Sequence, residues 1–364
     1  MKEVVKYSAE NTGIEHFMRP PTESLGADLM DACTLIEQKI NKVGERVAYT
    51  LASTEIKPNL SIGSEIELLL FSQDFDPSIH RYGNADDEKV NPNYSRKHLK
   101  AVREIMGGIH KTTRKGGIAD VLYAECPTLV RRIFAEVRTR PSDVLGYSTA
   151  MSSLQSYFQR RGGMTRPVVH SQHFHCSLTS ASGFNLLCSD RVVLAIKKGI
   201  IDSYQRFLPL VMLPEEVEEE NQKSVGLDSG VRLRGSLYGH GYPRRIEGRL
   251  SSSEYMFDPY VNLLVHLIGV ARGLEHTFSI TDIDADRKLQ FSDDYDVYYF
   301  MTGANITKYQ DEIEKMMNDP VLPQFLNRDL IQKLAEKAQL YWDISKGNIS
   351  VADARHVGKS SCPL

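Results

Sequence analysis

The chain has 364 residues, of which 41% are hydrophobic and 25% charged, and its formal net charge is −3. This composition is typical of a soluble globular protein with a large core, and it argues against a general attraction to nucleic acid or membrane surfaces. Five cysteines without a CxxC pair indicate neither a disulfide framework nor a structural zinc site. Because no signal-peptide core and no apolar run of ~18 residues is found, we expect a cytoplasmic protein that does not contact membranes.

The first predicted elements are a helix and a buried strand. Apolar residues recur at helical spacing from residue 22 to 44, and a strongly apolar run follows at residues 65–71. Side chains alternate along a strand, so Glu65 and Glu67 share one face of it. Paired buried carboxylates repel each other and require a cation. The pair indicates either a metal site or a strand end at which both side chains reach water.

A polar region separates this strand from the next ones. Residues 74–96 have the composition of a loop, and the basic segment 96–115 is interpreted as a solvated amphipathic helix rather than a phosphate-binding surface. Extended runs follow at 121–125 and 130–139. The second of these carries Glu136.

The next predicted strand carries two histidines. Along residues 172–178 the side chains of His173, His175 and Ser177 alternate with apolar ones and therefore share a face. A lone histidine on a strand is usually structural. Two on one face, in a chain that already holds paired carboxylates, favour a metal or phosphate site.

Two later strands carry arginines. Residues 230–235 include Arg232, and in the strand 245–250 the side chains of Arg245, Glu247 and Arg249 share one face. Packed charges are costly unless they are solvated, mutually paired or bound to a charged ligand. This strand is therefore either a flat exposed face or part of a site for charged ligands.

The rest of the chain is mostly helical. Helical patterns and end signals predict helices at residues 142–161, 190–208, 260–276 and 311–346. The acidic run 215–220 is interpreted as a solvated loop.

The order of these motifs resembles the catalytic domain of the glutamine synthetase superfamily, which includes the glutamate–cysteine ligases. The resemblance covers roughly residues 60–275. It rests on the paired glutamates, Glu136 before Val-x-Thr, the HxHxS strand, Tyr-x-Arg-x-x-Pro, and Arg-Ile-Glu-x-Arg. It implies an α+β fold: a curved, mainly antiparallel sheet with helices behind it and a helical C-terminal part. The implied organisation is a lead-in at 1–60, a catalytic domain at 61–280 and an extension at 281–364.

The resemblance also implies a site for ATP and two or three Mg²⁺ or Mn²⁺ ions. In it, Glu67, Glu136 and Glu125 hold one ion, and Glu65, His173 and Glu247 hold a second. The nucleotide and its phosphates are assigned to His175, Ser177, Arg232 and Arg245. The carboxylate substrate and the transferring phosphoryl group are assigned to Arg206 and Arg249, and Glu247 is counted with these catalytic residues.

The sequence departs from the family pattern in the part that would bind the amine. About sixty residues precede Glu65, too few for the family's small first domain, and Met212 stands where the flap glutamate is expected. A further family arginine falls near Ser224. The expected function is an ATP-dependent ligase that forms an amide through an acyl-phosphate. It would join glutamate or a similar amino acid to an amine larger than ammonia.

The sequence also allows a second function and indicates the partners of the chain. The missing amine-site residues are also compatible with a catalytically inactive scaffold or binding protein. A homo-oligomer is expected, and nucleic acid is an unfavoured amine acceptor.

Overall fold

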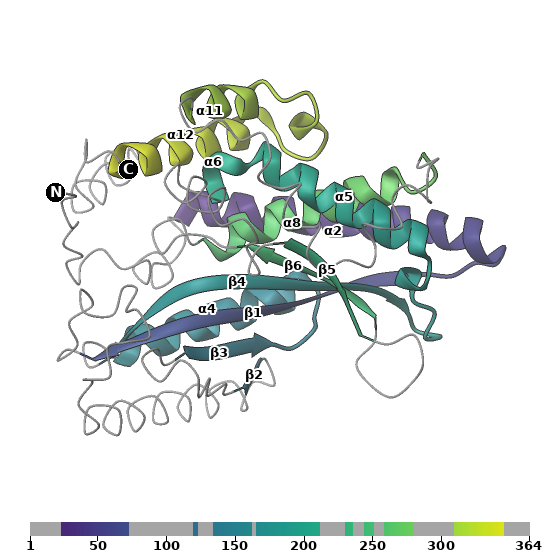
Figure 1. The fold of residues 1–364 in the computed structure, drawn as a ribbon, viewed down its shortest axis with the longest axis horizontal. Helices are drawn as coiled ribbons and strands as arrows, with labels where there is room; N and C mark the ends of the chain where they lie inside the picture. The colour runs from purple at the N-terminus through teal and green to yellow at the C-terminus, as the bar shows by residue number, and fades with distance from the viewer. Residues whose placement is uncertain are drawn as a thin grey trace, which may run out of the picture.

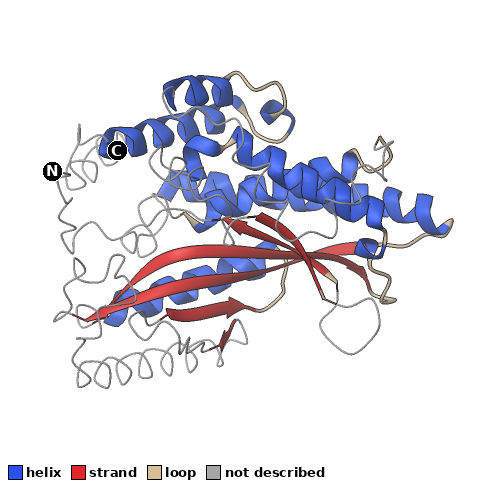
Figure 2. Ribbon diagram, in the orientation of Figure 1, coloured by secondary structure: helices blue, strands red, loops and turns tan. Residues whose placement is uncertain are grey.

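The computed structural model describes residues 23–72, 119–122, 134–161, 165–211, 230–235, 244–250, 258–279 and 309–345. These residues form an antiparallel sheet with helices packed against it (Figure 2), so the predicted α+β class is confirmed. Glu125, the basic segment 96–115 and the acidic run 215–220 lie outside the described residues.

The described part of the sheet has the strand order β2-β3-β1-β4-β6-β5. All five neighbouring pairs are antiparallel. The long strands β1 and β4 pair along almost their whole length and curve together across the molecule (Figure 1). The strands are β1 Pro58–Ser72, β2 Ala119–Leu122, β3 Phe134–Thr139, β4 Thr165–Ser180, β5 Gly230–Arg234 and β6 Arg245–Leu250.

The helices form a layer along the sheet. Figure 1 shows α2, α5 and α8 running beside one another, with α11 and α12 beyond them. None of the described helices has both the length and the hydrophobicity needed to cross a membrane. The helices are α2 Glu23–Ala52, α4 Val144–Arg161, α5 Asp190–Arg206, α6 Leu208–Val211, α8 Pro259–Glu275, α11 Tyr309–Met317 and α12 Arg328–Ser345.

One face of the sheet is apolar and packs on the helices. Ile66 of β1, Phe174 of β4 and Ile246 of β6 are fully buried there, and they alternate with charged or polar residues that point to the other face. Helix α8 contacts both α2 and α5, and every residue from Pro259 to Ala271 is buried. A helix that is mostly hydrophobic around its circumference is expected to be buried between other elements, as α8 is.

A buried polar network joins the two central strands to the helices directly behind the charged face. The Gln172 amide donates hydrogen bonds to Ser64 Oγ at 3.0 Å and to the Tyr147 hydroxyl at 2.8 Å. The Asn262 amide of α8 donates to Gln172 Oε1 at 3.1 Å. Because Ser64 and Gln172 precede Glu65 and His173, the network holds the backbone of both residues.

A buried histidine lies behind β6. The imidazole of His266 on α8 stacks on the Phe174 ring, with 5.4 Å between the ring centroids. It occupies the space beside Gly248, where a Cβ atom would come 2.8 Å from His266 Nδ1. Burial, with a smaller effect from His175, lowers the pKa of His266 from 6.5 to about 3. The ring is therefore neutral at ordinary pH.

Helices α5 and α8 cross at glycines. A Cβ atom on Gly269 would lie 2.5 Å from the Cα atom of Ile200 in α5, which is backbone that cannot move aside cheaply. We predict that Gly269→Ala lowers the free energy of unfolding by about 1–3 kcal/mol or more, as overpacking does. Urea unfolding followed by circular dichroism measures this loss.

The control is Gly44→Ala in α2, where the nearest atom to a new Cβ is the side-chain Pro58 Cγ at 3.2 Å. Alanine also favours the helix there by about 1 kcal/mol. Equal costs for the two variants would contradict the close crossing of α5 and α8.

The pKa of His266 predicts a dependence of stability on pH. The unfolded chain binds a proton at this residue below about pH 6.5, whereas the folded chain binds it only below about pH 3. Stability is therefore lost as the pH falls between these values, by up to about 1.4 kcal/mol per pH unit.

Urea unfolding from pH 7 to 4 should show this slope in the natural protein and a shallower one in His266→Leu. Phe174→Leu, which keeps the titrating group, should lower stability and keep the slope; identical slopes in all three proteins would refute the assignment.

Candidate active site

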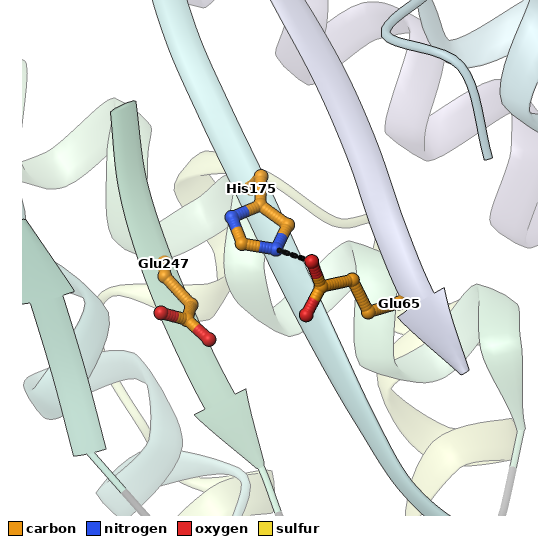
Figure 3. A group of neighbouring side chains, drawn as sticks. All are labelled: Glu65, His175 and Glu247. Atoms are coloured by element: carbon orange, nitrogen blue, oxygen red, sulfur yellow. Dashed lines mark ion pairs between the residues drawn. The ribbon is translucent and has the colours of Figure 1, made fainter. Parts of the chain in front are cut away.

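Three strands bring the predicted ligand residues together on the face opposite the core. Glu65 on β1 lies directly opposite His173 on β4, and His175 lies opposite Glu247 on β6. Opposite residues of antiparallel strands share a face, so the separate motifs of the sequence meet there. Figure 3 shows Glu65, His175 and Glu247 gathered from these three strands. We call Glu65, His173, His175 and Glu247 the ligand cluster.

Three members of the ligand cluster, Glu65, His175 and Glu247, are close enough to share one ion. His175 Nε2 lies 3.2 Å from Glu65 Oε1, and His173 Nδ1 lies 3.5 Å from Glu65 Oε2 and 3.7 Å from Glu247 Oε1. One ligand atom each of Glu65, His175 and Glu247 lie within 4.8 Å of one another. Two carboxylates with imidazole form a donor set suited to Mg²⁺ or Mn²⁺. The residues present therefore fit the kind of metal that the resemblance implies.

Both carboxylates of the cluster are largely shielded from water. The side chain of Glu247 is 2% exposed and that of Glu65 is 13% exposed. Burial raises the pKa of Glu65, but hydrogen bonds from His173 and His175 and the charge of Arg138 outweigh it and hold this pKa well below its ordinary value. Glu65 is therefore a carboxylate at neutral pH, ready to accept a cation.

A contact with Arg245 sets the tautomer of His175. Arg245 Nε donates to His175 Nδ1 at 3.1 Å. A guanidinium nitrogen can only donate, so Nδ1 is the acceptor and Nε2, which lies 3.2 Å from Glu65 Oε1, carries the proton. A cation on His175 Nε2 requires the other tautomer and therefore the loss of this Arg245 contact.

Arginines surround the ligand cluster on the same face. Arg232 of β5 lies opposite Glu247, as the two strands pair, and Arg234 lies opposite Arg245. Two of the arginines were not singled out by the sequence analysis. Arg138 of β3 pairs with Glu65, at 3.1 Å between Nε and Oε1, and Arg234 Nε pairs with Glu247 Oε2. The signal for both was the alternation itself, because Arg138 follows Glu136 by two residues and Arg234 follows Arg232 by two.

The strand register also places the remaining predicted ligands of the sheet. Glu67 lies opposite Glu136, Arg249 lies opposite His173, and Ser177 follows His175 by two residues on β4. All four positions are on the charged face. For Glu67, Glu136 and Arg249 the structure describes the strand but not the side chain, and Glu125 lies outside the described residues. Their roles as ligands stay predictions.

Arg206 lies elsewhere in the fold. It ends α5, in the helical layer, where its Nε donates to Asp202 at 2.8 Å and its Nη1 pairs with Asp319. These two carboxylates raise the pKa of the guanidinium further. Arg272 of α8 also pairs with Asp202, at 3.0 Å. The contact of Arg206 with substrate stays a prediction, and the described partners of its side chain are Asp202 and Asp319.

The chain has a glutamine synthetase-like fold, as comparison with solved structures shows. The sequence matches no profile of a known protein family and no curated protein. Two structures of GmaS, a gamma-glutamylmethylamide synthetase of the glutamine synthetase family, are similar to it. The ligand-free one has a TM-score of 0.52 at 16% identity and covers 90% of this chain and 77% of its own. An ADP complex has a TM-score of 0.50 at 16% identity and covers 87% and 76%.

The geometry of the ligand cluster predicts a metal site that depends on Glu247. We expect Glu247→Gln to weaken Mn²⁺ binding by about tenfold or more, because the variant loses a charged, buried oxygen ligand. Isothermal titration calorimetry measures the change. Glu55→Gln, at an exposed surface pair with Lys57, is the matched control and should bind Mn²⁺ as the natural protein does. Unchanged affinity in Glu247→Gln would contradict the site.

Proposed function

We propose that this chain is an ATP-dependent ligase that joins a carboxylate to an amine through an acyl-phosphate. The observation that carries the proposal is the ligand cluster set among arginines on one face of a glutamine synthetase-like sheet. The GmaS structures support it, since one of them is an ADP complex. Their resemblance in fold, together with the chemistry of this face, favours a ligase over a scaffold.

The charges of the face suit this reaction. By strand register it carries five carboxylates, of Glu65, Glu67, Asp120, Glu136 and Glu247, and five arginines, Arg138, Arg232, Arg234, Arg245 and Arg249. These charges balance, so a divalent cation leaves an excess of two positive charges. Such a face attracts anions. A nucleoside triphosphate and a carboxylate, which repel each other in water, are brought together by it.

The glutamates, arginines and Ser177 of the face each have a separate role in this reaction. The ligand cluster would hold one divalent ion, and Glu67 with Glu136 a second; when bound, the ions neutralise phosphate charge and orient the terminal phosphoryl group. Arg232 and Arg245 bind phosphate oxygens, and Arg249 binds the carboxylate and the transferring group through its planar guanidinium. Ser177 contacts the nucleotide. The proposal does not require Arg206.

The reaction has two steps. An oxygen of the substrate carboxylate attacks the terminal phosphorus of ATP, and ADP leaves with the electrons of the broken P–O bond. The amine nitrogen then attacks the activated carbonyl carbon, phosphate leaves, and the amine loses a proton. No protein nucleophile takes part, so catalysis rests on positioning and on stabilisation of charge.

We infer that the carboxylate is glutamate or a similar amino acid and that the amine is larger than ammonia. The expected flap glutamate is replaced by Met212, and a site that lacks acidic groups closing around ammonium loses its selectivity for that small ion. The name gamma-glutamylmethylamide synthetase supports this inference, because it names an amide of an organic amine rather than of ammonia.

Product analysis tests the function. We expect incubation with ATP, Mg²⁺, glutamate and a mixed pool of amines to release ADP and to give a glutamyl amide of an organic amine, identified by mass spectrometry. Glu136→Ala and Glu247→Ala should abolish this turnover, whereas Glu275→Ala, an exposed residue of α8 paired with Lys39, should retain it.

Three results would count against parts of the proposal. Glutamine formation from ammonia, without preference for any organic amine, would show the acceptor to be wrong. An active Glu247→Ala enzyme would refute the site. Mn²⁺ binding without ADP release, over a broad panel of acids and amines, would favour the inactive scaffold.

A further inference from the structure

We propose that Arg138 and Arg234 are exchangeable counter-ions: each holds a glutamate of the ligand cluster in the metal-free protein and turns to a phosphate-type anion when a divalent cation binds. This inference rests on the proposed function of the same face. It adds that the metal and the anion bind cooperatively, and it names the two residues that couple them.

The first support is that Glu65, His175 and Glu247 each contact an arginine. Arg138 pairs with Glu65, Arg234 pairs with Glu247, and Arg245 donates to His175. These contacts use Glu65 Oε1, Glu247 Oε2 and His175 Nδ1. The guanidiniums thus supply the positive charge that buried carboxylates require when no metal is present.

The second support is a difference in exposure within each pair. The side chain of Arg138 is 39% exposed and that of Arg234 is 40% exposed, whereas their partners are 13% and 2% exposed. The glutamates are fixed within the sheet face and cannot follow a departing partner. The arginines lie on the solvent side, where a long side chain can change its rotamer at little cost. Exchange of partner is therefore open to the arginines alone.

The third support is the charge of the four residues taken together. Glu65 and Glu247 are balanced by Arg138 and Arg234, so this group is neutral before a metal arrives. A divalent cation leaves an excess of two positive charges, which repels the two guanidiniums. A phosphate dianion removes that excess by taking the guanidiniums as its own partners. Free metal is thus bound weakly, and metal with phosphate strongly.

The experiment measures Mn²⁺ affinity by isothermal titration calorimetry, with and without saturating inorganic phosphate. Phosphate should tighten Mn²⁺ binding to the natural protein. Arg138→Gln and Arg234→Gln should each bind Mn²⁺ about tenfold more tightly than the natural protein in the absence of phosphate, because the repulsion is reduced. The effect of phosphate on both variants should shrink, since coupling between two ligands is reciprocal and acts through these residues.

A thermal melt supplies a second readout that does not depend on catalysis. Arg234→Gln leaves Glu247 buried without this partner, so its melting temperature should fall in the absence of metal. Mn²⁺ should then raise the melting temperature of Arg234→Gln by more than it raises that of the natural protein. Arg234→Lys, which keeps the charge, should behave like the natural protein in both measurements.

The control is Arg46→Gln, at an exposed arginine of α2 in the helical layer, which changes the net charge by the same amount. It should leave Mn²⁺ affinity unchanged. Equal or weaker Mn²⁺ binding in both sheet variants, with binding intact in the natural protein, would overturn the counter-ion role and leave the proposed function standing. No Mn²⁺ binding by the natural protein, with or without phosphate, would overturn both.

Discussion

The charged face depends on one physical constraint: carboxylates that have been taken out of water must keep a cation beside them. The side chain of Glu247 is 2% exposed, and that of Glu65 is 13% exposed. The imidazoles of His173 and His175 lie close to these carboxylates. An unpaired charge in such a place would cost several kcal/mol. Guanidiniums and imidazoles lie against these carboxylates, and the same need makes the cluster a strong candidate for binding a divalent ion.

Contacts on the core side of the sheet hold the strands that carry these charged residues in place. Gln172, Ser64, Asn262 and Tyr147 hydrogen-bond to one another directly behind Glu65 and His173, and this fixes β1 and β4 against α4 and α8. Behind β6 the absence of a side chain at Gly248 lets the neutral ring of His266 pack close to the strand that carries Glu247. Repulsion between ligands is therefore opposed by backbones that are held in place, not by side-chain contacts alone.

The sequence predicted the sheet face well because alternation with a period of two is a local property. Glu65, His173, His175, Glu247, Arg232 and Arg245 could each be placed on a face from their neighbours alone. The pairing of distant strands could not be read in this way. Arg138 became a partner of Glu65 only through the register of β1 with β3, and the contact of Arg245 with His175 depends on β4 and β6 lying side by side. The partners of Arg206 could not be read from the sequence either, because a motif match does not show that Asp202 and Asp319 pair with its side chain.

The distribution of charge explains why the charged face of the sheet suits a ligase better than a protein that only binds a metal ion. A protein that only binds a divalent ion gains from surplus carboxylates and loses from nearby guanidiniums. Here the arginines on the face are at least as many as the glutamates, and several of them touch the ligand residues directly. Such a balance weakens the binding of a bare ion and strengthens that of an ion accompanied by phosphate. The face is therefore matched to a metal–nucleotide complex, in which neither the cation nor the anion arrives alone.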